Sequence, residues 1–371
     1  MLKKSISNPA ILVLKICKWN PIMRHISIYF MVYFLFLSCG GTNSSIPPSE
    51  IGSLSRGSII YSHDLSDAIT DFLPSVVEVI CMMDYDVEHY VYQIEDGQYI
   101  IDATSPTGFR LEPGAGILKD KKNFRAFGGG LIVGWSDREY LILTSRHIVT
   151  QEDTVTHYVK ENGDDTPIIR TQAFLRRLRF AIRGQQHSYL REARVVADDS
   201  RADLALVAVL KRDKVGEAYK GSVIKSFENV WGSLAVIAGY PSEILQIAMG
   251  LTSAAPYPGN FSLDVNGTFG YSGGPVFTFD EQKGLSFAGV GRSIPGKHVF
   301  HVAPDSTLQF ATKLLPSDIY HLQIEEIPVF GAARMYAVDI RFILRFLSDA
   351  MLELRKSGFE LTEPFEKILS D

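Results

Sequence analysis

Short apolar runs rich in β-branched residues recur along most of the chain, separated by glycine, proline and small polar residues. Continuous or alternating apolar runs of this length are typical of strands. The runs that predict strands cover residues 76–81, 129–135, 140–144, 192–196, 203–209, 233–238, 247–253, 275–279, 286–290 and 335–338. The pattern therefore predicts an all-β fold.

Two of the connections between these runs predict hairpins. The polar residues 136–139 separate the runs 129–135 and 140–144. Further upstream, Asp96-Gly97 lies between the apolar segments 90–95 and 98–101, and Asp-Gly is a strong signal for a tight two-residue turn. Residues 103–128 contain several glycines and prolines and predict a long loop.

Residues 150–190 form an insertion that contains an alternating segment. Leu178, Phe180 and Ile182 alternate with basic residues in 177–183, which predicts an extended strand, in a hairpin that protrudes beside the crevice of the fold. The arginines of 176–183 either form a solvated strand face or contact an acidic substrate, an anionic lipid or a partner. The overall charge favours the solvated face.

Helical spacing is clear near the C-terminus. Asp339 is a good N-cap, and a stripe of apolar residues at helical spacing predicts a closing helix over 340–357 that packs on the barrel. The stripe consists of Ile340, Ile343, Leu344, Leu347, Met351 and Leu354. A short helix is also predicted over 67–73, before the first strand.

Composition is that of an ordinary globular protein. Of 371 residues, 46% are hydrophobic and 21% are charged, which is enough apolar material for a sizeable core. The net charge of −5 gives no general attraction to nucleic acid, so no nucleic-acid partner is expected. The sequence contains no solenoid-type repeat and no low-complexity block.

The N-terminal segment predicts export and anchoring. Arg24 precedes the apolar run 26–38, which is short for a membrane span, and Cys39 follows it. This order matches a bacterial lipoprotein signal, which implies lipid attachment at Cys39 after removal of everything before it. A conventional signal peptide or a membrane-anchoring helix is the alternative, with Cys39 incidental. With the lipoprotein signal, Met23 is a plausible translation start.

The segment after Cys39 is polar and contains glycine, serine and proline, which predicts a flexible tether over 39–57. Residues 1–38 are then an upstream extension and signal. Cys81 stands alone in the mature chain, without a partner for an internal disulfide, and is predicted to be a buried strand residue.

Candidate chemistry centres on the segment Gly270-Tyr271-Ser272-Gly273-Gly274-Pro275. It places one hydroxyl between glycines that leave backbone N–H groups free to face a reacting carbonyl. A serine hydroxyl needs a base to take its proton and an acid group to orient that base. His147 directly follows a predicted strand and Asp203 begins another, so both lie where a rigid scaffold can aim them.

At these residues the chain resembles the trypsin-like serine proteases, and most closely their bacterial HtrA/Deg branch. The resemblance covers roughly residues 70–350. Its matching segments are Leu73–Val79, Gly130–Val133, Leu143–Val149, Arg194–Leu206, Gly239–Pro241 and Asp264–Pro275. The resemblance implies two antiparallel six-stranded β-barrels with an active site in the crevice between them and a C-terminal helix.

The resemblance also implies roles for individual residues. His147, Asp203 and Ser272 correspond to the catalytic triad, and the N–H groups of Gly270 and Ser272 to the oxyanion hole. The substrate pocket is expected to have its floor near Asn266 and a wall on Gly289, Val290 and Gly291, with Arg292 at the mouth. An uncharged pocket of this kind suggests cleavage after apolar or small side chains. No metal or other cofactor is implied.

Three departures from the family pattern stand out. Tyr271 precedes the serine, where the family has Asn or Asp, which argues against activation through a newly cleaved N-terminus. His147 and Asp203 are separated by 56 residues, so an insertion is expected between them. The chain ends at Asp371, which leaves no room for the PDZ domain that usually follows in the HtrA/Deg branch.

The sequence thus predicts a serine endopeptidase in a domain over 58–360, with barrel one at about 70–215 and barrel two at about 220–340. Its expected partners are a protein or peptide substrate and a membrane, reached through a lipid anchor on Cys39 at the bacterial cell envelope, periplasmic or surface-exposed. One alternative is a protease-fold binding or adhesion protein without turnover. Another is a nucleic-acid or membrane-surface binder that uses the arginine strand.

Overall fold

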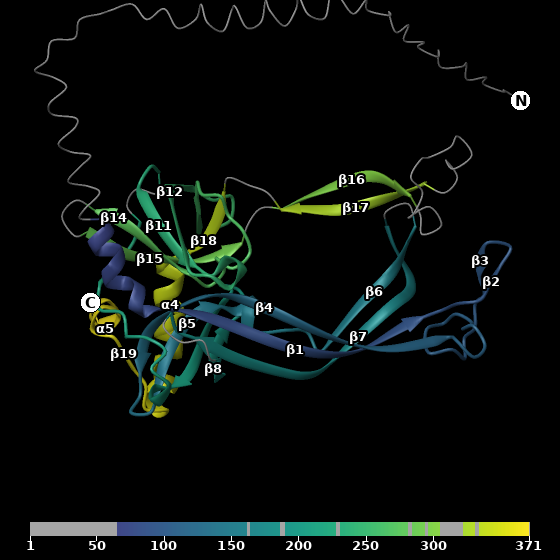
Figure 1. Cartoon of the computed structure of the whole chain (residues 1–371), viewed down its shortest axis with the longest axis horizontal. Coiled ribbons are helices and arrows are strands. Elements are labelled where there is room, and N and C mark those ends of the chain that lie inside the picture. Colours follow the sequence, from purple (N-terminus) through teal and green to yellow (C-terminus); the bar gives the residue numbers. More distant parts are fainter. Residues whose placement is uncertain are drawn as a thin grey trace, which may run out of the picture. The chain divides into compact units, whose positions relative to one another are not determined.

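Two closed antiparallel β-barrels form the body of the protein (Figure 1). The computed structural model describes residues 65–161, 164–185, 190–227, 231–280, 284–293, 296–304, 322–330 and 334–370. In each barrel six strands pair in a ring, which one additional pairing closes, β1 with β7 in the first barrel and β15 with β18 in the second. The predicted all-β fold with two six-stranded barrels is confirmed.

Barrel one closes through the pairing of β7 with β1. Its strands, in spatial order, are β1 (Val76–Tyr90), β4 (Ile117–Trp135), β5 (Glu139–Ser145), β9 (Leu204–Leu210), β8 (Arg191–Asp199) and β7 (Asp164–Arg183). Outside the ring, β6 (Thr154–Glu161) pairs with β7, and β19 (Glu360–Leu361) pairs with β4. The predicted hairpin at 136–139 is β4–β5.

Barrel two closes through the pairing of β15 with β18. Its strands, in spatial order, are β15 (Gly284–Ser293), β14 (Pro275–Asp280), β11 (Leu234–Gly239), β12 (Gln246–Ala254), β13 (Asn260–Leu263) and β18 (Met335–Asp339). A short strand, β10 (Ser222–Val223), lies parallel to β15. Three 3-10 turns connect elements, namely η1 (Leu73–Ser75), η2 (Lys211–Asp213) and η3 (Pro241–Glu243).

Helices cover the apolar surface that the barrels share. The predicted closing helix is α4 (Ile340–Lys356), and the Asp339 side chain accepts the Arg341 N–H at 2.9 Å as its cap. Its buried residues Ile343 and Leu347 join one core cluster with residues of both barrels. Residues 65–72 are helical as predicted, apart from the exact start.

The sequence placed the end of the domain too early. After α4, β19 and α5 (Glu363–Ser370) continue the fold, and Phe365 of α5 is fully buried in the same core cluster. The folded unit therefore extends beyond residue 360.

The predicted loop over 103–128 is wrong in its second half, because β4 already begins at Ile117. The first strand likewise runs to Tyr90 rather than ending at Cys81. Both extensions carry many charged residues and pair with each other over their whole length. The outer part of β4 is exposed on both faces and therefore has no apolar alternation that sequence patterning could detect. The predicted turn at Asp96-Gly97 is present, with β2 (Ile94–Glu95) and β3 (Gln98–Tyr99) on either side.

The insertion after the base forms the predicted protruding hairpin, β6–β7. Together with the outer parts of β1 and β4 it makes a sheet that extends beyond barrel one (Figure 1). A small apolar cluster around Met83, Tyr85 and Val87 covers one face of this sheet. Cys81 is a fully buried free thiol at its base, and burial raises its pKa to about 12.

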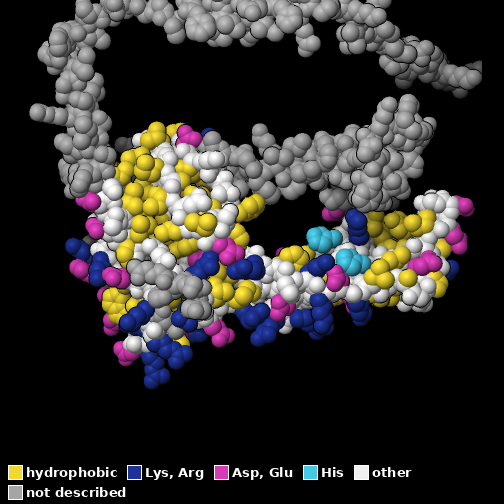
Figure 2. Space-filling model, in the orientation of Figure 1, with side chains coloured by type: hydrophobic (Ala, Val, Ile, Leu, Met, Phe, Trp, Pro, Cys, Tyr) yellow, Lys and Arg dark blue, Asp and Glu magenta, His cyan; other side chains and the backbone are white. Residues whose placement is uncertain are grey.

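Basic side chains gather along the protruding sheet (Figure 2). Many of them pair with acids of the central strand β1. Arg176 contacts Asp86 at 2.6 Å and Arg179 lies 3.7 Å from Asp84. These pairs compensate part of the charge of the arginine strand and favour the interpretation as a solvated face, which stays a prediction.

A second hairpin was not predicted from the sequence. Strands β16 (Gly296–Pro304) and β17 (Leu322–Phe330) pair along their whole length and are inserted between β15 and β18. Among the helices of the described segments, none has the length and apolar character needed to cross a bilayer.

The ion pair between Glu78 and Arg183 should be a strong local determinant of stability. Glu78 is fully buried, its Oε1 has no hydrogen-bond partner in the described part of the chain, and Arg183 binds its Oε2. Burial raises the pKa of Glu78 although Arg183 opposes this. Arg183→Met leaves a buried carboxylate uncompensated and should lower the free energy of unfolding by about 3 kcal/mol at neutral pH.

Chemical denaturation over a pH series checks this. A carboxyl whose pKa is raised by folding contributes most to stability below its unfolded pKa, and that contribution is lost as pH rises through the folded pKa. The Arg183→Met penalty should therefore shrink in acid. Arg179→Met is the matched control and should cost less than about 1 kcal/mol, since its pair is exposed. A penalty that does not change with pH would contradict this account.

Candidate active site

His147 and Asp203 form a rigid pair at the edge of barrel one. Strand β5 leads directly into α3 (Arg146–Val149), which carries His147. The Asp203 carboxylate accepts twice from this residue, with Oδ1 2.9 Å from the backbone N and Oδ2 2.8 Å from Nδ1. The Asp203 carbonyl also accepts the Arg146 N–H at 3.0 Å. The two backbone bonds hold the first turn of α3 against Asp203, and the third holds the imidazole through Nδ1. The other ring nitrogen, Nε2, can then accept a proton.

The backbone of Asp203 makes this arrangement possible. Its φ of +58° lies in the left-handed region, which Asp tolerates better than most residues. In this conformation both the carbonyl and the carboxylate of one residue reach the first turn of α3. Strand β9, which begins at Leu204 and is buried along most of its length, holds Asp203 at its entrance.

Ser272 lies in a tight turn that directly precedes β14. The Gly274 N–H donates to the Tyr271 carbonyl at 3.0 Å, and the Gly273 N–H donates to the Gly291 carbonyl at 2.7 Å. Gly273 has a φ of +75°, and a Cβ there would lie 2.3 Å from both the Gly129 carbonyl oxygen and Thr144 Oγ1. Glycine is therefore required directly after the serine.

Backbone contacts dock this turn onto barrel one. The Gly129 N–H donates to the Ser272 carbonyl at 2.8 Å. A Cβ on Gly128 would lie 2.2 Å from that same carbonyl oxygen, and one on Gly129 would lie 2.6 Å from the Gly274 Cα. Both positions are thus glycines because two backbones meet there without room for side chains.

A second contact between the barrels joins the segment that carries His147 to barrel two. Ser145, directly before α3, donates its hydroxyl to the Gly291 carbonyl at 3.0 Å. Thr144 donates to the Gly129 carbonyl at 2.7 Å. Both residues are fully buried. The segment that carries His147 is therefore bonded to β15, whose Gly291 carbonyl also accepts the Gly273 N–H of the turn that contains Ser272.

Tyr271 anchors the turn by packing. Its side chain is 4% exposed and lies in the interior cluster of barrel two with Ile237, Phe261 and Met335. Burial raises the pKa of its hydroxyl. The family's polar residue at this position is thus replaced by an aromatic one that is held by apolar contacts.

The two expected oxyanion donors flank Tyr271. The Gly270 carbonyl accepts the Tyr240 N–H at 2.9 Å, and Gly270 has a φ of +104°. The Gly270 and Ser272 N–H groups themselves make no backbone hydrogen bond within the described segments. Both residues line the same cavity as His147.

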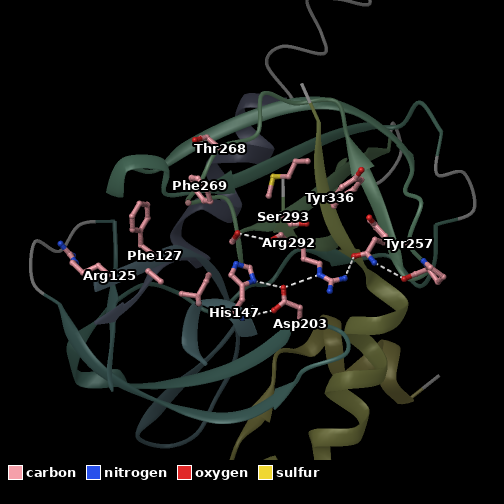
Figure 3. Close-up of a pocket in the computed structure, with 17 residues that line it drawn as sticks. Arg125, Phe127, His147, Asp203, Tyr257, Thr268, Phe269, Arg292, Ser293 and Tyr336 are labelled. Carbon is pink, nitrogen blue, oxygen red and sulfur yellow. Dashed lines mark hydrogen bonds and ion pairs between the residues drawn. The ribbon is translucent and has the colours of Figure 1, made fainter. Parts of the chain in front are cut away.

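Arg292 contacts both Ser272 and Asp203. The Ser272 hydroxyl donates to the Arg292 carbonyl at 3.1 Å and, among the described residues, makes no hydrogen bond with the His147 ring. The Arg292 Nε lies 3.5 Å from Asp203 Oδ2, and Nη1 donates to Asn260 Oδ1 at 3.2 Å. Figure 3 shows His147, Asp203 and Arg292 in a row, joined by these interactions.

A cavity of ≈ 890 Å³ opens beside these residues. Its lining is mostly apolar and includes Phe127, Phe269, Met335 and Tyr336. Figure 3 shows Phe127 and Tyr336 on opposite sides. A cavity of this size is large enough to hold a substrate side chain together with part of its backbone.

The predicted pocket residues do not line this cavity. Asn266 is exposed. Gly289 packs against Phe261, Val290 is buried in the shared core, and Gly291 lies against the Tyr271 carbonyl. The wall comes instead from the next residues of β15, Arg292 and Ser293.

Several lining residues were not found from the sequence. Arg292 was placed at the mouth of the pocket, but its pairing with Asp203 depends on a contact between barrels that no local pattern reveals. Met335 and Tyr336 follow the inserted hairpin, whose length obscured their position. In the described part of the chain, no cluster of three or more His, Cys, Asp or Glu residues is arranged to hold a metal ion.

Part of the chain matches a known family. Residues 128–284 match the family model of the trypsin-like peptidase domain. This segment carries His147, Asp203 and Ser272, and together with the two barrels it fits a serine protease of the chymotrypsin fold. A search of curated proteins finds no match to the chain.

The packing role of Tyr271 is testable. Tyr271→Ala removes a buried aromatic side chain and should lower the free energy of unfolding by about 3 kcal/mol. It should also speed hydrogen exchange at the Gly273 and Gly274 amides, whose hydrogen bonds hold this turn. Denaturation and hydrogen exchange measured by mass spectrometry on the peptide around Ser272 check both.

Tyr271→Phe is the matched control and should behave like the wild type, because it keeps the ring. Equal damage from both substitutions would show that the hydroxyl, and not the ring, anchors the turn.

Proposed function

We propose that the protein is a serine endopeptidase that uses Ser272 as nucleophile, His147 as general base and acid, and Asp203 as the orienting group. The observation that carries the proposal is the double hydrogen bond of Asp203 to His147, with Ser272 lining the same cavity. A carboxylate on Nδ1 fixes the tautomer in which Nε2 can take a proton.

The mechanism follows from these positions. The Ser272 hydroxyl turns from the Arg292 carbonyl toward His147 Nε2, which takes its proton as the oxygen attacks the peptide carbonyl. Catalytic hydrogen bonds are often poorly aligned without substrate and tighten on binding. The N–H groups of Gly270 and Ser272 receive the developing oxyanion, worth about 3 kcal/mol per donor.

The imidazolium then donates its proton to the leaving amine, and an acyl-enzyme on Ser272 remains. Water, activated by the same ring, hydrolyses it. The apolar cavity lining favours substrates with an apolar or aromatic side chain next to the scissile bond. The similarity to the HtrA/Deg branch stays a prediction.

Covalent labelling with a fluorophosphonate tests the nucleophile. The wild-type protein should label and hydrolyse an unfolded protein such as casein, and Ser272→Ala should lose both, with a rate loss of up to about a millionfold. Ser293→Ala is the matched control, since Ser293 lines the same cavity but lies outside the nucleophile turn. Labelling should persist in this variant.

A folded wild-type protein that never labels would favour the alternative, a protease-fold binding protein without turnover. The hydrogen bond of Ser272 to the Arg292 carbonyl is the observation that favours this alternative, because it turns the hydroxyl away from the base.

We further propose that the enzyme is anchored at the bacterial cell envelope through a lipid on Cys39. The support is the sequence alone, because Cys39 lies outside the described residues. Metabolic labelling with an alkyne fatty acid in a bacterial host should mark the wild type and place it in the membrane fraction.

Cys39→Ser should abolish that labelling and release the protein, whereas Cys17→Ser should leave both unchanged because residue 17 is removed with the signal. Membrane attachment that persists in Cys39→Ser would favour an uncleaved helix as the anchor.

A further inference from the structure

Besides His147, Arg292 is the one side chain of the described segments that forms an ion pair with Asp203. Both groups act on the same carboxylate oxygen, because Oδ2 faces His147 Nδ1 at 2.8 Å and Arg292 Nε at 3.5 Å. Asp203 is 15% exposed and Arg292 32% exposed at the side chain, so solvent screens the pair only in part.

The guanidinium is held in this position from its other side. Its Nη1 donates to Asn260 Oδ1, and Asn260 in turn donates to the Pro258 carbonyl at 3.1 Å. The backbone of Arg292 is fixed by β15 and accepts the Ser272 hydroxyl. One residue therefore contacts both the nucleophile and the orienting acid of the proposed site.

The geometry points to Arg292 as a positioning residue that fixes the Asp203 carboxylate against the His147 ring. This inference deepens the proposed function and rests on it. A carboxylate alone stabilises the imidazolium, and a cation on the same oxygen offsets part of that stabilisation.

Several other charged groups on the elements around α3 have partners of their own. Arg146 pairs with Asp198 on β8, Arg125 on β4 pairs with Glu243, and Glu78 on β1 pairs with Arg183. Asp199 on β8 accepts the N–H groups of residues 201 and 202. Among the described residues, Arg292 is thus the cation that acts on the Asp203–His147 pair directly.

Titration of the His147 ring by NMR tests the inference without any substrate. The protein is Ser272→Ala, labelled at histidine, and the His147 signal is assigned by its loss in His147→Ala. Arg292→Gln should move the midpoint of the titration upward by about one pH unit. Arg292→Lys keeps the charge and should recover most of the wild-type midpoint.

Arg146→Gln is the matched control, because it removes a neighbouring charge that pairs with Asp198 and not with Asp203. It should move the midpoint by less than half as much as Arg292→Gln. Titrations that superimpose with and without the Arg292→Gln substitution, or equal shifts from Arg146→Gln and Arg292→Gln, would overturn the inference.

The rate of fluorophosphonate labelling against pH supplies the kinetic readout. In Arg292→Gln the rise of the rate with pH should move upward with the NMR midpoint. A loss that is equal at every pH would mean that Arg292 has a structural role alone. Failure of the wild type to label while the NMR shift is present would reject the proposed function and leave the Arg292–Asp203 coupling standing.

Discussion

The two barrels meet backbone to backbone, and the position of Ser272 relative to His147 depends on that contact. Gly128 and Gly129 of β4 touch the turn that contains Ser272, and the Gly129 N–H bonds to the Ser272 carbonyl. Ser145, two residues before His147, bonds to β15 of barrel two. No side chain lies between these glycines and the turn, so the contact cannot adjust by a change of side-chain conformation. A displacement of the turn by about 1 Å can lower the rate of an enzyme roughly 100-fold.

Around this rigid contact the site departs from the family pattern in a consistent way. Tyr271 holds the turn that contains Ser272 by apolar burial, and Arg292 places a cation beside Asp203. The turn is therefore stabilised independently of any ionised group at residue 271. The cation beside Asp203 comes from Arg292, which reaches across from β15.

The sequence was most informative at positions where the backbone geometry allows few residue types. The glycines around Ser272 and the acid at a strand entrance indicated both the site and the fold, because these positions allow few substitutes. The charged end of β4 was missed because it is exposed on both faces and has no apolar period. The outer part of β1 was missed although Met83, Tyr85 and Val87 alternate with acidic residues there. The cavity lining was misplaced because it depends on the register of β15 against β18 and on an inserted hairpin, and neither is encoded locally.

The central claim is that His147, Asp203 and Ser272 act as one unit. It is tested most directly by the second-order rate of fluorophosphonate inactivation in His147→Ala, Asp203→Asn and the double variant. Residues that act as a unit have strongly non-additive effects. The account predicts that the double variant reacts no more slowly than His147→Ala alone. Losses that multiply, or a His147→Ala protein that reacts as fast as the wild type, would contradict it.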